Sequence, residues 1–154
     1  MNDTALKPQT QDIVVDQVLP HTPATIWKTL TTSELMGRWL MVPTGFEPVK
    51  GKQFTFQTTP AGAWDGVIHL QVLDVAPNER LVYSWKGGHE TNADYGSRLD
   101  TVVTWTLTPV AGGTRLRLVH SGFVIRRNDA AFQKMSEGWK HVVQHIDTLS
   151  GELH

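Results

Sequence analysis

One histidine stands where it could do chemistry, at the end of an apolar strand face. Leu116, Leu118 and His120 recur at every second position, so they share one face of an expected strand that ends just before a Ser-Gly-Phe turn. A neutral imidazole both donates and accepts a hydrogen bond near pH 7, which makes His120 a candidate general acid or base. The alternative is a buried histidine that bonds a backbone carbonyl group.

The six tryptophans form a second set of candidates. An indole offers a flat face for stacking on a planar ligand, and its buried N–H needs an acceptor. Tyr83 and Trp85 share a strand face with Leu81. On a concave face they would contact an aromatic molecule, and Tyr83 would assist His120 in catalysis. Core packing is the alternative interpretation for every one of these aromatic residues.

The sequence gives little support for a metal site or for a nucleotide cofactor. His141 and His145 lie four residues apart, a spacing that can hold a metal ion on a helix, but the residues between them supply no carboxylate. We therefore expect a solvated helix face and no metal. Cysteine is absent, which excludes disulfides, thiol nucleophiles and cysteine-based metal centres. No glycine-rich phosphate-binding pattern occurs, so no cofactor is expected.

The charge balance narrows the classes of partner. The 154 residues include 14 Lys+Arg and 15 Asp+Glu, for a net charge of -1, which favours neither nucleic acid nor an anionic membrane. The first dozen residues hold no apolar signal segment, and no run approaches the roughly 20 apolar residues of a membrane span. These features predict a cytoplasmic protein with a flexible arm over 1–11 and one domain over 12–154.

Short strands separated by turn residues must position the candidate side chains. Alternating apolar and β-branched residues predict strands at 13–19, 53–58, 64–76, 81–85, 100–109 and 114–123. Thr22 before Pro23 predicts the start of a helix, and a second short helix is expected from Thr32 or Ser33 to Leu40. The polar segment 87–97 has neither period and is expected to be a long, mobile or functional loop.

A long helix ends the chain. From about Asp129 apolar residues recur at three- and four-residue steps, which predicts a helix about 30 Å long. Gly138 within it costs about 1 kcal/mol relative to alanine, so it is expected either to admit close approach of the sheet or to kink the helix at a pocket mouth. The element order predicts an α+β fold. A curved antiparallel sheet of about six to seven strands wraps around this helix, two short helices follow the first strand, and a cavity remains between helix and sheet.

Several segments together resemble a known family. They are IWKTLTTSELMGRWL, KGKQFTF, LDVAPNERLVYSW, GGTRLRLVHSGF and GWKHVVQHIDTL, in that order along nearly the whole chain. This set resembles the START-like (SRPBCC) helix-grip superfamily, in the branch homologous to the activator of heat-shock-protein-90 ATPase. The resemblance implies a helix-grip fold with a pocket between the long helix and the sheet. It implies less about activity, because the superfamily includes carriers, cyclases and co-chaperone domains.

Three functions follow as hypotheses. The first is binding of a small hydrophobic or aromatic molecule in the cavity. Its expected lining is Trp39, Phe56, Tyr83, Trp85, Trp105, His120, Phe123, Met135 and Trp139. The first alternative is a protein-interaction module of co-chaperone type, with a chaperone or a second copy of the chain as partner. The second alternative is a cyclase- or hydrolase-type enzyme that uses His120 and Tyr83.

Overall fold

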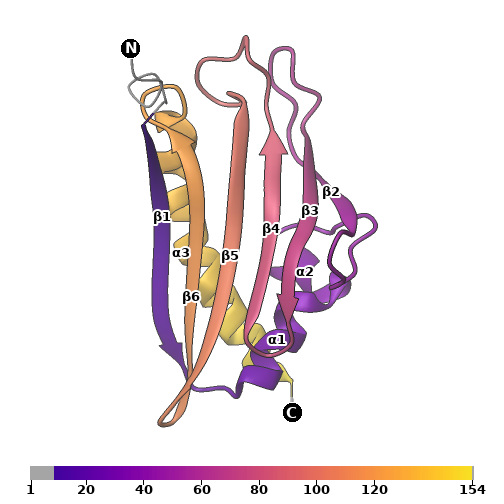
Figure 1. Cartoon of the computed structure of the whole chain (residues 1–154), viewed down its shortest axis with the longest axis vertical. Helices are drawn as coiled ribbons and strands as arrows, with labels where there is room; N and C mark the ends of the chain where they lie inside the picture. The colour runs from indigo at the N-terminus through magenta and orange to yellow at the C-terminus, as the bar shows by residue number, and fades with distance from the viewer. Residues whose placement is uncertain (1–8, 154) are drawn as a thin grey trace, which may run out of the picture.

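An antiparallel sheet and three helices make up the fold of the computed structural model, which describes residues 9–153 (Figure 1). In chain order the elements are β1 (Thr10–Leu19), α1 (Pro23–Thr31), α2 (Ser33–Trp39), β2 (Gln53–Gln57), β3 (Val67–Ala76), β4 (Arg80–Gly87), β5 (Leu99–Val110), β6 (Gly113–Val124) and α3 (Asp129–Glu152). The predicted α+β helix-grip class is confirmed.

The sheet has six strands in the order β1-β6-β5-β4-β3-β2, and every neighbouring pair is antiparallel. Each strand from β2 to β6 pairs with the next one along the chain, and β1 forms the edge of the sheet beside β6. Irregularities between Gln11 and Ile13 and between Val72 and Asp74 interrupt the regular register. Such bulges bend a sheet, so they contribute to the curvature that receives a helix.

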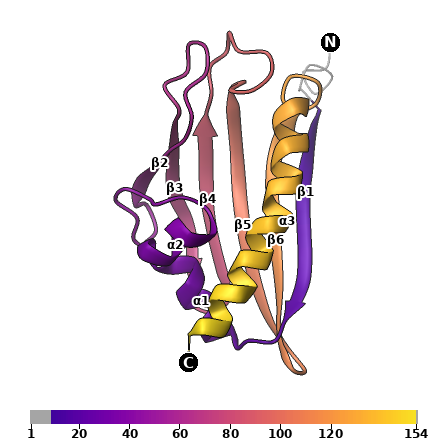
Figure 2. The same cartoon turned by 180° about the vertical axis from the view of Figure 1, so that it is seen from behind.

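The concave face is covered by helices of very different length. The 24-residue helix α3 crosses the sheet diagonally, and α1 and α2 lie beside its C-terminal half (Figure 2). Alternate strand residues point inward, as in β4, where Leu81, Tyr83 and Trp85 are buried. Around the N-terminal half of α3, loops take the place of the two short helices. This difference between the two ends decides where space remains.

Local chemistry explains where the first helices begin. The Thr22 side chain accepts a hydrogen bond from the Thr25 amide at 3.2 Å, and Pro23 occupies the first turn of α1, as predicted. Thr32 ends α1 and precedes α2 in an extended conformation. Trp39, at the end of α2, donates its indole N–H to the Thr29 carbonyl at 2.9 Å. This bond joins the two helices into one unit.

Two expectations need correction. The arm predicted over 1–11 lies mainly outside the described residues, but Thr10 and Gln11 already pair with β6 as part of β1. The sheet therefore begins earlier than the apolar pattern indicates, because backbone pairing needs no apolar side chain. At Gly138 an added Cβ atom would find no atom within 4 Å, so close approach of the sheet is not the reason for this glycine.

No helix of residues 9–153 is long and apolar enough to cross a membrane.

Candidate functional site

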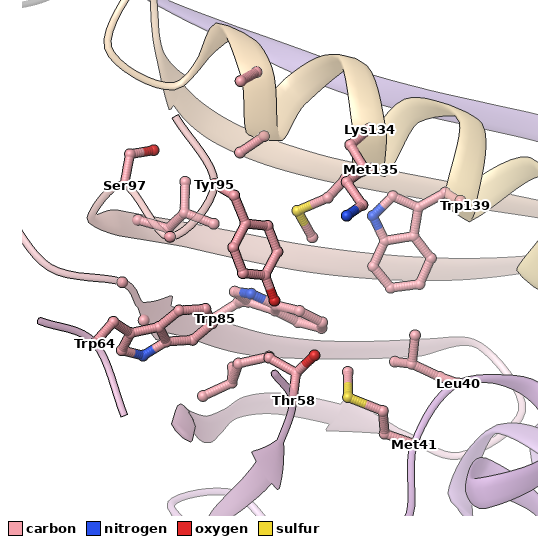
Figure 3. A pocket seen from close by; sticks show the side chains of 18 of the residues that line it. Leu40, Met41, Thr58, Trp64, Trp85, Tyr95, Ser97, Lys134, Met135 and Trp139 are labelled. Carbon is pink, nitrogen blue, oxygen red and sulfur yellow. The ribbon is translucent and has the colours of Figure 1, made fainter. Parts of the chain in front are cut away.

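A cavity of about 370 Å³ lies between the N-terminal half of α3, the end of β4 and the loops beside them (Figure 3). Its walls are mostly apolar or aromatic, and they come from segments far apart in the chain. The lining residues are Leu40, Met41, Thr58, Trp64, Ile68, Trp85, Gly87, Gly88, Tyr95, Gly96, Ser97, Leu99, Ala130, Ala131, Lys134, Met135, Gly138, Trp139 and Val142.

One face of α3 forms the helical wall. Ala131, Met135, Gly138 and Trp139 fall at the three- and four-residue steps that bring side chains to the same side of a helix. Gly138 and the alanines leave room beside the larger Met135 and Trp139. Since a Cβ atom at Gly138 would meet open space, the absence of a side chain there enlarges the cavity.

Aromatic rings form much of the opposite wall. Trp85 of β4 meets Trp139 of α3 with ring centroids 5.9 Å apart and planes at 66°. Trp64 lies on the loop between β2 and β3, and Tyr95 lies on the loop between β4 and β5. Their ring centroids are 6.0 Å apart and their planes are at 52°. Such pairs present both ring faces and edges, which suits contact with an aromatic guest.

The two loops are tied to each other at the rim of the cavity. The Asn92 amide donates to the Ala61 carbonyl at 2.7 Å, and the Tyr95 hydroxyl donates to the Thr59 carbonyl at 2.9 Å. Gly88 has a φ of +79°, and a Cβ atom there would lie 2.1 Å from a backbone oxygen. The long polar loop expected over 87–97 is therefore held by specific bonds and by a glycine that no larger residue can replace without strain.

His120 lies behind the cavity wall, fully buried, and both of its ring nitrogens are bonded. The Trp139 indole N–H donates to His120 Nδ1 at 3.0 Å, and His120 Nε2 lies 2.8 Å from Thr101 Oγ1. The Thr101 hydroxyl in turn donates to the Trp85 carbonyl at 2.8 Å. Since an indole can only donate and a carbonyl can only accept, this chain of bonds requires a neutral imidazole with its proton on Nε2.

Burial lowers the pKa of His120 from 6.5 to about 3, because the charged form loses its hydration. The imidazole thus stays neutral at physiological pH and has no free nitrogen for a guest. Tyr83 is also enclosed: its hydroxyl accepts the Trp105 indole N–H at 3.0 Å, and burial raises the pKa of Tyr83 above its ordinary value. Neither candidate catalytic group faces the cavity.

The predicted lining divides into two sets. Trp85, Met135 and Trp139 line the cavity. The residues placed elsewhere, in the closed core, are Trp39, Phe56, Tyr83, Trp105, His120 and Phe123. These six were expected in the lining because they share the inward side of the sheet or helices. Other core side chains separate them from the cavity: Trp39 of α2 packs on Trp105, and Trp139 and Phe132 of α3 pack on His120 and Phe123.

Sequence reasoning missed a second group of lining residues. Leu40 and Met41 follow α2, Trp64 and Tyr95 lie on loops, and Lys134 is an exposed helix residue. The available signal for Lys134 was helical spacing, because this residue lies three positions after Ala131 and four before Gly138. For the loop residues no periodicity exists that would have indicated an inward direction.

The remaining candidate residues lie away from this site. His141 and His145 are exposed on α3, and no group of three or more metal-ligating side chains occurs within residues 9–153.

Comparison with known proteins gives a consistent result. The family model described as "Activator of Hsp90 ATPase homolog 1-like protein" matches residues 20–151. Protein MLL2253 from Mesorhizobium loti is 33% identical with a TM-score of 0.81, over 94% of this chain and 99% of that chain. No curated protein matches the chain.

Two more distant structures share the fold. Protein BH1534 from Bacillus halodurans is 19% identical with a TM-score of 0.71, over 94% of this chain and 99% of that chain. CalU16 from Micromonospora echinospora is 20% identical with a TM-score of 0.69, over 92% of this chain and 76% of that chain. The START-like resemblance is thus confirmed. The chain belongs to the family of activator of Hsp90 ATPase homolog 1-like proteins.

Proposed function

We propose that the protein binds a small hydrophobic or aromatic molecule in the cavity between α3 and the sheet. The observation that carries this proposal is an open volume of about 370 Å³ with an apolar and aromatic lining. Pockets for small molecules commonly measure roughly 300–1,000 Å³ and are mostly apolar with few polar anchors. The missing side chain at Gly138 supports the same function, because a larger residue there would fill space that a guest needs.

The enzymatic alternative depends on His120 and Tyr83, and the polar atoms of both are already hydrogen-bonded inside the core. Acid or base catalysis by His120 requires a ring nitrogen within hydrogen-bond reach of the substrate. Trp139 and Thr101 occupy both nitrogens inside the core, and the Tyr83 hydroxyl is paired with Trp105. These bonds favour binding over catalysis by this pair.

The interaction-module alternative requires a contiguous exposed apolar surface. Among the described residues, the large exposed apolar side chains include Val14 and Val18 on β1, Leu73 on β3 and Val110 at the end of β5. Charged side chains interrupt this surface, since the exposed Arg115 of β6 lies opposite Val18, between β1 and β5. The cavity is therefore the better supported site.

A neutral aromatic probe tests the proposal. N-phenyl-1-naphthylamine becomes fluorescent in apolar surroundings, and we expect saturable binding by the native protein. Gly138→Leu should weaken this binding at least about tenfold, since its side chain would occupy the cavity. Gln144→Leu, an exposed site on the same helix outside the lining, is the matched control and should leave binding unchanged.

Circular dichroism should show that both variants keep the fold. Failure of the native protein to bind the probe, or equal binding by Gly138→Leu, would contradict the proposal. Native mass spectrometry of protein purified from its own host would then search for the physiological guest.

A further inference from the structure

Lys134 is the one charged residue among those that line the cavity of the described chain. It projects from α3 at the rim, where its Nζ atom lies 4.7 Å from the centroid of the Tyr95 ring (Figure 3). Because Tyr95 is bonded to Thr59 in the neighbouring loop, the ammonium group rests on a ring that is itself anchored. A positive charge is thereby held beside an otherwise apolar space.

This ammonium group lacks a protein counter-ion in residues 9–153. No carboxylate of that part of the chain lies within 4.0 Å of Lys134, whereas Lys140, farther along α3, pairs with Glu137 at 3.2 Å. An aromatic face attracts a cation without neutralising it. The charge at the rim is therefore available to an anion.

A second donor borders the cavity deeper inside. The indole N–H groups of Trp64 and Trp139 are bonded, to the Val67 carbonyl and to His120. The Trp85 N–H has no hydrogen-bond partner among residues 9–153, although every fully enclosed side-chain nitrogen and oxygen there has one. The N–H of Trp85 consequently faces open space, and Trp85 lines the cavity. Both unpaired groups, the ammonium and this N–H, are donors, so a guest must supply acceptors.

We propose that the preferred guests are amphipathic organic anions with an aromatic or aliphatic body and a single acidic group. The body lies in the cavity between Trp85 and Trp139, and the anionic group pairs with Lys134 at the rim. This inference rests on the proposed function, and it adds the charge of the ligand. An exposed ion pair is worth up to about a fivefold change in affinity at moderate salt.

Two fluorescent probes with the same aromatic framework distinguish the effect of the ligand's charge from the effect of its shape. 1-Anilinonaphthalene-8-sulfonate is N-phenyl-1-naphthylamine with an added sulfonate, so the two differ by one anionic group. Fluorescence titrations with both probes are compared for the native protein, Lys134→Met and Lys140→Met. Methionine keeps much of the apolar stem of lysine, and both variants change the net charge equally.

The expected result is a loss specific to one variant and one probe. Lys134→Met should weaken binding of the sulfonate probe about fivefold and leave binding of the neutral probe within about twofold. Lys140→Met should change neither. Added salt should weaken binding of the sulfonate probe by the native protein more than by Lys134→Met, because screening acts on the ion pair.

Two other results have separate meanings. If both probes bind and Lys134→Met changes their affinities equally or not at all, the preference for anions is wrong and the proposed function stands. If neither probe binds the native protein, the proposed function fails, and the preference for anions fails with it.

Discussion

At the scale of single residues, the polar groups behind the cavity hold its wall in place. The bonds from Trp139 through His120 and Thr101 to the Trp85 carbonyl connect α3 to three strands of the sheet. A buried polar group without a partner costs roughly 1–3 kcal/mol, so each bond makes other side-chain positions unfavourable. The imidazole therefore orients the indole of Trp139, whose ring forms the cavity wall.

The lowered pKa of His120 predicts a pH-dependent stability. Between pH 6.5 and about 3, this histidine binds a proton in the unfolded chain but not in the folded protein. Its contribution is complete above pH 6.5 and is lost as the pH falls, by about 1.4 kcal/mol per pH unit. We expect urea unfolding between pH 6 and 4.5 to show this decrease in the free energy of unfolding.

Two variants isolate the contribution of His120 to the pH dependence of the free energy of unfolding. His120→Gln should lose the slope, because glutamine can both donate and accept but does not titrate. His141→Gln, at an exposed position, should retain it. Equal slopes in the native protein and His120→Gln would show that another group is responsible.

Asp16 and Asp74, which are paired with arginines, change the free energy of unfolding mainly below pH 4.5. A hydrogen bond from Arg115 is the main reason that the pKa of Asp16 is lowered, and one from Arg80 lowers the pKa of Asp74. The folded protein keeps both groups charged to lower pH than the unfolded chain does. Their contribution to stability is present above the ordinary carboxyl pKa and is lost as the pH falls further.

At the scale of elements, α3 combines a packing face with a cavity wall. Its C-terminal half buries Val143, Ile146 and Leu149 in the core. Its N-terminal half places small residues, including Gly138, toward the open space. One apolar stripe thus has two roles, which are decided by what lies opposite each turn.

Two glycines of the lining should respond oppositely to alanine. Gly138→Ala should raise the free energy of unfolding by up to about 1 kcal/mol, because helix propensity improves and no atom lies within 4 Å of the new Cβ. Gly88→Ala should lower the free energy of unfolding by more than about 1 kcal/mol, since the residue has positive φ and a Cβ would clash with the Ser97 oxygen. Urea unfolding at pH 7 measures both, and a loss of stability in Gly138→Ala would contradict the open space beside α3.

At the scale of the whole molecule, the cavity lies where the helical layer is incomplete. The helices α1 and α2 cover the sheet beside the C-terminal half of α3, and two loops tied through Asn92 and Tyr95 take their place at the other end (Figure 2). A guest that bridges α3, β4 and these loops would therefore stabilise contacts across the molecule.

A bound guest should raise the melting temperature. At a free concentration of one hundred times Kd, binding adds about 2.7 kcal/mol to the free energy of unfolding. For a chain of this length we expect a rise of roughly 5–10 °C with N-phenyl-1-naphthylamine, measured by circular dichroism. Gly138→Leu should show no such rise, and an equal rise in that variant would place the probe outside the cavity.

The sequence by itself determined the order and type of the elements. Alternation in strands, the Thr22-Pro23 start of α1 and the long periodic stretch after Asp129 are local patterns, since each follows from the backbone geometry of a single element. They identify inward faces, on which Trp85, Met135 and Trp139 lie.

Only the tertiary structure decided which inward residues meet open space. Trp105 and Trp85 have the same local pattern, but the first packs beneath α2 against Trp39 and the second borders the cavity. The partners of His120 come from other strands and from α3, and the rim is formed by loops without any period. Packing and loop closure depend on contacts between distant segments, and no local pattern of residues records them.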